Sequence, residues 1–327
     1  MMSKLRVGVI GLGVGRQHIR CYTELENAEL VALADPIESV VNEQARECGA
    51  KAYTDAHAML EEEKLDAVSI CTPPASHLEC TQAAAAVGTH VLCEKPMAPS
   101  VDHCDGMIEA CTSAGVHLTI GQKKRFHPLV IRAKEVAESD PIRWAVAKYA
   151  LGRVEKEWFW QEDDGGGPLL ENSIHTIDML RHLMGEIVTV YAEGGNLFMP
   201  DFAPQMDAAA YTFRFENGSM AAVGSGMASE WEFANEHFYL ACDRCEIRFH
   251  GSFDNPVHWW LGHREDPTNP EEDTIERHDS FMAEIEHFLG CVESGERPFV
   301  TGEDARGSVA VCLAVKQSAR SGQPVKM

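Results

Sequence analysis

Hydrophobic and polar positions alternate in two different ways along the chain. Up to about residue 121, short apolar runs of strand type are separated by longer segments whose apolar positions recur with the spacing of a helix. The expected strands are Leu5–Ile10, Glu29–Ala34, Ala67–Cys71, His90–Cys93 and Val116–Ile120, and the expected helices are Arg16–Leu25, Ile37–Cys48, His77–Val87 and Val101–Ser113. This alternation predicts an α/β fold with a doubly wound parallel sheet.

Glycines and a capping pattern mark the ends of these helices. Gly49, Gly88 and Gly115 each follow the end of an expected helix, where glycine favours the left-handed conformation that ends helices. Ser76 and Glu79 have the spacing of a capping box, so we expect Ser76 to cap the helix that begins at His77.

The pattern changes after about residue 122, where strand-like runs predominate. The expected strands are Trp144–Leu151, Val188–Glu193, Ala208–Phe215, Ser219–Val223 and His237–Ala241, with helices at Leu169–Met184, Ser280–Glu293 and Glu303–Arg320. Asn217-Gly218 separates two of the strands and predicts a hairpin. The second half is therefore expected to form a mainly antiparallel sheet with helices, and the chain to divide into domains at residues 1–121 and 122–327.

Three glycines follow the first expected strand directly. Gly11, Gly13 and Gly15 can let the backbone approach a pyrophosphate at the start of the next helix, and Asp35, at the end of the second strand, can accept hydrogen bonds from an adenosine ribose. The third glycine comes one position earlier than in G-x-G-x-x-G, and glycines after a strand can also form a plain turn. The strand before the loop and the acid after it favour a dinucleotide site that includes Val14. The expected cofactor is NAD rather than NADP, because Asp35 would repel a 2′-phosphate.

Composition and charge indicate a globular protein and argue against one that binds nucleic acid or a membrane. The 327 residues are 45% apolar and 24% charged, as in ordinary globular proteins, and the formal charge of −23 argues against nucleic acid or an anionic membrane as a partner. No apolar run approaches the length of a membrane span, and the first run is expected to be a strand rather than a signal peptide.

The cysteines indicate a reducing compartment. Eleven of them, an odd number, are scattered through strand and helix patterns, which favours free thiols and a cytoplasmic location. Cys242 and Cys245 form one isolated C-x-x-C. Since no second pair accompanies it, we expect two ordinary thiols and no metal site.

Polar residues follow two strands of the expected parallel sheet, at the edge where ligands bind in such folds. Glu94-Lys95-Pro96 follows the strand His90–Cys93, and a lysine before a proline is held extended. A partly desolvated amine there could exchange protons, although a solvated surface lysine is the alternative. Thr72-Pro73 and His77 follow the preceding strand and could pack against the cofactor or simply form a turn.

A second polar group follows the glycine run at residues 165–167. If a helix begins near Leu169, then Glu171, His175 and Asp178 share one face, and a histidine between two acids is a candidate general base. Zinc is a competing use of these residues, but no third ligand has a telling spacing. Residues 122–126, Gln-Lys-Lys-Arg-Phe, follow the last strand of the first domain; their four polar side chains could contact substrate or form an exposed basic turn.

Taken together, these segments resemble the Gfo/Idh/MocA family of glucose–fructose oxidoreductase, inositol dehydrogenase and rhizopine-catabolism proteins. The resemblance runs nearly end to end, and its most specific motif is Glu94-Lys95-Pro96; His18, Arg125-Phe126 and the segment Val300–Asp304 add to it. It implies a Rossmann domain followed by an α+β domain with an open-faced sheet that commonly pairs with another subunit, giving a homodimer or homotetramer. It also implies NAD or NADP, and hydride transfer to or from a hydroxyl of a sugar, inositol or related polyol.

The resemblance also assigns roles to residues. Lys95 and His175 would handle the proton, and Glu171 and Lys124 would contact the substrate, together with Asp178. The expected cofactor-binding residues are Gly11, Gly13, Val14, Gly15, Asp35, Thr72, Pro73, His77, Glu94, Lys95 and Pro96. The family usually has Asp and Gly where this chain has Glu171 and Ser173, which leaves the substrate open. Two further activities occur among such proteins, an NAD-dependent glycoside hydrolase and a non-catalytic NAD-bound regulator; a regulator is expected to lack the lysine or the histidine.

Overall fold

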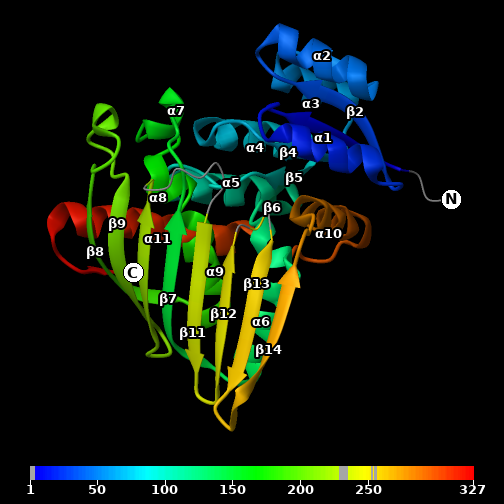
Figure 1. Cartoon of the computed structure of the whole chain (residues 1–327). Coiled ribbons are helices and arrows are strands. Elements are labelled where there is room, and N and C mark those ends of the chain that lie inside the picture. Colours follow the sequence, from blue (N-terminus) through cyan, green and yellow to red (C-terminus); the bar gives the residue numbers. More distant parts are fainter. Residues whose placement is uncertain (1–3, 228–234, 252, 254–255) are drawn as a thin grey trace. The chain divides into compact units, whose positions relative to one another are not determined.

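The computed structural model describes residues 4–227, 235–251, 253 and 256–327 (Figure 1). Contacts divide the chain into two compact units. The first comprises Met1–Lys123 and Ser280–Gly307, and the second comprises Lys124–Asp279 and Ser308–Met327. Contact units need not coincide with domains, so the expected division between residues 121 and 122 stays a prediction. Among the described residues, no helix is both long enough and apolar enough to cross a membrane.

A parallel sheet forms the centre of the first unit. Its described part has six strands in the order β3-β2-β1-β4-β5-β6, which is a doubly wound order in which the strand sequence reverses between β1 and β4. The strands are β1 (Leu5–Ile10), β2 (Ala28–Ala34), β3 (Lys51–Tyr53), β4 (Ala67–Ile70), β5 (His90–Cys93) and β6 (Leu118–Ile120). All five neighbouring pairs are parallel, which confirms the fold class expected for this half.

Of the five helices described between these strands, the four that were expected begin and end close to the expected residues. The five are α1 (Gly15–Glu24), α2 (Glu38–Cys48), α3 (Ala56–Glu63), α4 (His77–Ala86) and α5 (Val101–Ala114). Gly49 and Gly115 end α2 and α5 in the left-handed conformation, with φ of 77° and 69°. The sequence pattern did not indicate α3, which is short and is capped by Asp55, whose carboxylate accepts hydrogen bonds from the backbone N–H groups of His57 and Ala58.

The expected capping box at Ser76 is wrong. A short 3₁₀ turn, η1 (Pro74–Ser76), precedes α4, so Ser76 already has helical dihedrals and its side chain makes no capping hydrogen bond within the described part of the chain. A capping residue needs an extended backbone. The two prolines after β4 start the turn early and remove that conformation from Ser76.

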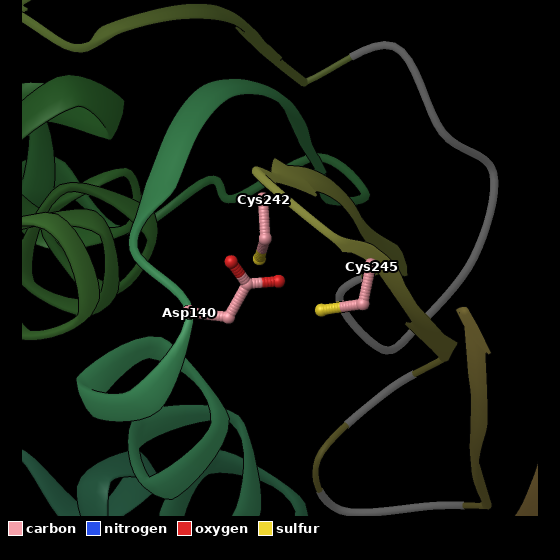
Figure 2. A group of neighbouring side chains, drawn as sticks. All are labelled: Asp140, Cys242 and Cys245. Atoms are coloured by element: carbon pink, nitrogen blue, oxygen red, sulfur yellow. The ribbon is translucent and has the colours of Figure 1, made fainter. Parts of the chain in front are cut away.

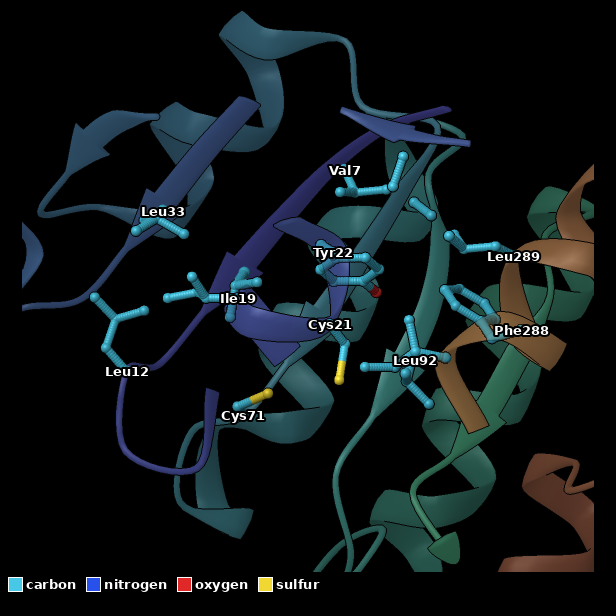
Figure 3. Close-up of a cluster of buried hydrophobic side chains, with 14 of the residues drawn as sticks. Val7, Leu12, Ile19, Cys21, Tyr22, Leu33, Cys71, Leu92, Phe288 and Leu289 are labelled. Atoms are coloured by element: carbon cyan, nitrogen blue, oxygen red, sulfur yellow. The ribbon is translucent and has the colours of Figure 1, made fainter. Parts of the chain in front are cut away.

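The last core element of the first unit comes from far along the sequence. In α10 (Ser280–Ser294), Ile285, Phe288 and Leu289 are fully buried and join the cluster that contains Val7 and Tyr22 (Figure 3). The residues after α10 extend the unit further, because the backbone N–H of Ile120 in β6 donates to the carbonyl of Val300.

The second unit is built on a larger sheet. Nine strands are described, in the order β14-β13-β12-β11-β7-β10-β9-β8-β15. They are β7 (Ile142–Ala150), β8 (Ile187–Gly195), β9 (Ala208–Phe215), β10 (Met220–Gly226), β11 (Asn235–Cys242), β12 (Cys245–Gly251), β13 (Val257–His263), β14 (Asp266–Ile275) and β15 (Val325–Lys326). Neighbouring strands are antiparallel except β7 and β10, which confirms a mainly antiparallel sheet. The hairpin at Asn217-Gly218 is also confirmed, since Gly218 has φ of 85° between β9 and β10.

Helices cover one face of this sheet, as Figure 1 shows behind the strands. They include α6 (Pro128–Ser139), α9 (Ile174–Met184) and the part of α11 (Gly302–Ser321) that lies in this unit. Ser318 of α11 accepts a hydrogen bond from the backbone N–H of Ala192 in β8 at 2.9 Å. The strands alternate buried and exposed residues, so the other face presents side chains to solvent.

We predict that Phe288→Ala lowers the stability of the first unit by about 3–5 kcal/mol, because it leaves a cavity in a packed core. The measurement is urea unfolding followed by circular dichroism and by the fluorescence of the second unit's tryptophans, because the first unit contains no tryptophan and its transition appears in circular dichroism alone. Phe299→Ala is the matched control, since Phe299 is 45% exposed and should tolerate the change. Equal effects of the two substitutions would contradict the assignment of α10 to this core.

Candidate active site

The glycine loop between β1 and α1 is shaped by close backbone contacts. Gly11 has φ of 85°, and a Cβ added there would lie 2.7 Å from backbone atoms of Cys71 and Thr72. A Cβ on Gly15 would lie 3.0 Å from Cγ1 of Val9. Gly15 therefore allows the close packing of helix on strand that the third glycine of a dinucleotide motif provides. The early position of this glycine leaves the contact in place.

The start of α1 suits a phosphate group. No side chain among the described residues caps this helix, and its first turn contains no acidic residue. Nothing described lies within 4 Å of the place where a Cβ of Gly13 would stand, and Val14 beside it is exposed. Backbone N–H groups at a helix N-terminus bind anions, so the loop fits the pyrophosphate of a dinucleotide.

The carboxylate of Asp35 holds the glycine loop by hydrogen bonds to the backbone. One carboxylate oxygen accepts from the backbone N–H of Leu12 at 2.9 Å, and the other from that of Ile37 at 3.0 Å. Each oxygen keeps a further lone pair, and Asp35 is only half-buried, so ribose hydroxyls could also donate to it. The residues of the first unit thus fit a bound dinucleotide.

Lys95 is held by a buried acid. The Glu94 carboxylate accepts from the Lys95 backbone N–H at 3.0 Å and lies 3.2 Å from Nε2 of His18. His18 is itself fully buried, with Nδ1 2.9 Å from the hydroxyl of Ser69. Burial works to raise the pKa of Glu94, but the His18 hydrogen bond and the charges of Lys95 and Lys123 outweigh it, so the pKa lies below its ordinary value. Glu94 therefore stays ionised and fixes the backbone at Lys95; its role as a cofactor ligand stays a prediction.

His77 connects the two loops at this edge of the sheet. Its Nε2 lies 2.9 Å from the carbonyl oxygen of Thr72, and its Nδ1 lies 3.1 Å from that of Pro96. The segment after β4, with Pro73, is thereby joined to the segment after β5, with the half-buried Lys95. These contacts give His77 a positioning role, and direct contact with the cofactor stays a prediction.

In the second unit, the single helix expected over Leu169–Met184 is wrong. The segment forms α8 (Gly167–Glu171) and α9, because the backbone N–H groups of Asn172 and Ser173 both turn back to the carbonyl of Pro168. Glu171 and His175 therefore lie on successive helices rather than on one helical face. Both side chains are nonetheless buried, at 6% and 9% exposure, so the break does not expose either of them.

The glycine run before α8 has a structural cause. A Cβ on Gly165 would lie 2.6 Å from the Cα and carbonyl oxygen of Phe159 in α7 (Glu157–Trp160), so no other residue fits. Gly166 and Gly167 have φ of 66° and 76°, which favours glycine. The loop brings α7 against the start of α8, the short helix that ends at Glu171.

Both carboxylate oxygens of Asp178 accept hydrogen bonds from other residues of this chain. Its two oxygens accept from Nε and Nη2 of Arg125 at 2.8 and 2.7 Å, and one also accepts from the Ser308 hydroxyl at 3.0 Å. Both members of this ion pair are buried. Its expected contact with substrate stays a prediction, and the observed bonds favour a role in positioning Arg125.

Lys124 lies next to this pair, in the 3₁₀ turn η2 (Lys123–Phe126), and forms a second buried ion pair, with Glu236 of β11. Its ammonium also lies 5.3 Å from the ring centre of Tyr149 and 5.0 Å from that of Phe253. Since Lys124 and Arg125 are both buried, the alternative of an exposed basic turn is wrong for them. Glu236 was not predicted, because no local pattern connects residues this far apart in sequence.

Several buried polar atoms have no hydrogen-bond partner in the part of the chain that the structure describes. Asn172 Nδ2 and Thr176 Oγ1 flank His175 in the second unit, and Thr72 Oγ1 and Gln122 Nε2 belong to the first. Buried polar groups are normally satisfied, so these atoms are available to a bound ligand. Of the four residues, the sequence had indicated Thr72 and Gln122 as candidates for ligand contact.

Comparisons with known proteins agree with a dinucleotide-binding first unit followed by an α/β second unit. The model of the Gfo/Idh/MocA oxidoreductase family with an NAD-binding Rossmann fold matches residues 5–122, and the model of its C-terminal alpha/beta domain matches residues 139–327. Myo-inositol 2-dehydrogenase of Thermotoga maritima is 29% identical over 99% of this chain and 98% of its own length. The 2,7-anhydro-N-acetylneuraminate hydratase of Escherichia coli is 31% identical over 72% of this chain and 64% of its own length.

A solved structure gives the same result. The aldose-aldose oxidoreductase from Caulobacter crescentus, complexed with glycerol, superposes with a TM-score of 0.89 at 26% identity, covering 99% of this chain and 100% of the other. The Rossmann unit is therefore of the NAD(P)-binding type, and the resemblance seen in the sequence is confirmed. This chain belongs to the Gfo/Idh/MocA family of oxidoreductases.

Proposed function

We propose that the protein is an NAD-dependent dehydrogenase that transfers a hydride between nicotinamide and a hydroxyl of a sugar, an inositol or a related polyol. The observation that carries this proposal is the buried, ionised Glu94, which holds Lys95 at the carboxyl edge of the parallel sheet whose glycine loop fits a dinucleotide. The names of the Thermotoga and Caulobacter relatives support the substrate class.

The chemistry can be assigned to two side chains. Bound NAD supplies the hydride acceptor. His175 acts as the general base that removes the proton from the substrate hydroxyl, and the ammonium of Lys95 stabilises the negative charge that develops on the substrate. Glu171 and Lys124 bind other hydroxyls. A neutral polyol suits this pair better than an acidic sugar, because the Glu171 carboxylate would repel a substrate carboxylate.

A second candidate is a reaction in which NAD is not consumed overall. The Escherichia coli hydratase favours it, since that relative is named for an addition or loss of water. A glycoside hydrolase that oxidises its substrate only transiently belongs to the same class. The regulator hypothesis is weaker, because this chain keeps both Lys95 and His175.

We also propose that the protein is a cytoplasmic homodimer or homotetramer that assembles through the open face of the nine-stranded sheet. That face exposes large apolar side chains at Trp144, Val146, Tyr191 and Met220. Contiguous exposed apolar residues are typical of interaction surfaces. The eleven cysteines, all within the described residues, are free thiols, which supports a reducing compartment.

The reaction class is tested by a screen of inositols, sugars and uronates with NAD, following nicotinamide absorbance and substrate consumption together. We expect NADH to form with a neutral polyol. In that reaction, Lys95→Ala and His175→Ala should each lower kcat by about 10²–10⁴-fold while the Kd for NAD stays nearly unchanged. Wild-type kcat in either variant would exclude that residue from proton transfer. Substrate loss without NADH would instead establish the second candidate.

We expect kcat/KM to be at least about tenfold higher with NAD than with NADP, which corresponds to about 1.4 kcal/mol. The Asp35 carboxylate repels a 2′-phosphate, and Pro36 and Ile37 beside it offer no positive charge. Steady-state kinetics with both cofactors is the measurement, and Asp35→Ala should reduce the ratio. Equal use of NADP by the wild-type protein would place Asp35 away from the ribose.

The Lys124–Glu236 pair is best tested by changing both residues. Replacing Lys124 alone would leave Glu236 buried without its countercharge, at a cost of about 3–5 kcal/mol, so loss of activity could reflect unfolding. The neutral double variant Lys124→Met/Glu236→Gln should fold, raise KM for the polyol about tenfold or more, and leave KM for NAD unchanged. An unchanged polyol KM would mean that the pair has only a structural role.

A further inference from the structure

A group of three potential metal ligands lies at one end of the sheet of the second unit, apart from the residues assigned above. Cys242 ends β11 and Cys245 begins β12, so the two thiols flank a tight turn. Asp140 directly follows α6. One carboxylate oxygen and the two sulfurs all lie within 4.8 Å of one another, and all three residues are buried (Figure 2).

We propose that Asp140, Cys242 and Cys245 bind one zinc ion, with a solvent molecule in the fourth position. Zn–S bonds of about 2.3 Å and Zn–O bonds of about 2.0–2.2 Å in a tetrahedron place ligand atoms about 3.5–3.8 Å apart. The three atoms lie within 4.8 Å of one another, so a shift of about 1 Å or less brings them to this spacing. Two sulfurs and one oxygen suit zinc, whereas magnesium and calcium prefer oxygen ligands alone.

The surroundings favour a charged centre with three anionic ligands. The backbone N–H of Arg244, inside the turn, donates to Oδ2 of Asp140 at 2.8 Å and leaves Oδ1 directed away from that bond. Such a second contact orients a metal-binding carboxylate. The Arg244 guanidinium lies 3.7 Å from Oδ1, and the Arg264 guanidinium donates to the carbonyl of Cys242 at 3.3 Å. Binding of Zn²⁺ to two thiols releases two protons and leaves one net negative charge, which these arginines offset.

The position of the site indicates a structural role. Glu236 and Cys242 lie near opposite ends of β11, about 20 Å apart at about 3.3 Å per residue. The ion would therefore be remote from the Lys124–Glu236 pair. It would link the end of α6 to the β11–β12 turn, where Arg244 already contacts both Asp140 and the carbonyl of Ser139. The sequence could not indicate the third ligand, because Asp140 precedes the C-x-x-C by a long stretch of chain.

The first test is metal content of the full-length protein purified without chelator, together with cobalt substitution. We expect about one zinc per chain and, with Co²⁺, a near-ultraviolet thiolate charge-transfer band. Cys242→Ser/Cys245→Ser should abolish both, and Asp140→Asn should lower zinc affinity about tenfold or more. Cys48→Ser and Asp243→Asn are matched controls, outside the ligand set, and should retain the metal.

If the cysteine or aspartate variants do not fold, a second measurement on the wild-type protein still tests the proposal. Removing zinc from the wild-type protein with a chelator should lower Tm by about 5 °C or more, and adding zinc alone should restore it. The proposal is overturned by less than a tenth of a zinc per chain after growth with zinc, by equal zinc content in the double cysteine variant, or by a mass two hydrogens lighter that shows a Cys242–Cys245 disulfide. Failure here leaves the proposed dehydrogenase activity unaffected, because that activity is measured with NAD and polyol.

Discussion

Burial of ionised side chains is the constraint on which the candidate site depends. A buried charge that loses its partner is strongly destabilising, so each such group must be matched within its own unit. Glu94 is matched by His18 and by the Lys95 backbone, and Asp178 by Arg125. The cost of breaking these pairs keeps the neighbouring functional side chains in one place. Preorganised groups of this kind need little rearrangement when charge develops on a substrate.

Much of the fold could be predicted from the sequence, because its signals are local. Five of the six strands described in the first unit, all but the short β3, and the glycine ends of α2 and α5 follow from short patterns of apolar residues and from the freedom of glycine. The break between α8 and α9 could not, since it depends on two N–H groups that share the carbonyl of Pro168. Ser76 failed as a cap for a similar reason, because the prolines before it changed its backbone conformation.

The candidate site was predictable in its residues but not in its contacts. Lys95, Glu171 and His175 were found from motifs, and each is at least half-buried in the structure. Glu236 and Ser308 were not found, since they reach Lys124 and Asp178 from distant elements and have no sequence signature of their own. The early third glycine is a contrasting case. It looked like a defect in the motif, yet Gly15 still packs against Val9 as a third glycine would.

The return of α10 to the first unit affects how the protein can fold during its synthesis. Domains usually fold as the chain leaves the ribosome, beginning at the N-terminus. Here Phe288 and Leu289 complete the core around Val7 and Tyr22, so the N-terminal sheet keeps an uncovered apolar surface until most of the second unit has been made. The nascent chain must carry this surface through translation of β7 to β14, which is all of the described nine-stranded sheet except β15. Folding of the cofactor-binding unit is thus tied to near-completion of the polypeptide, and chains that terminate early would be prone to aggregate.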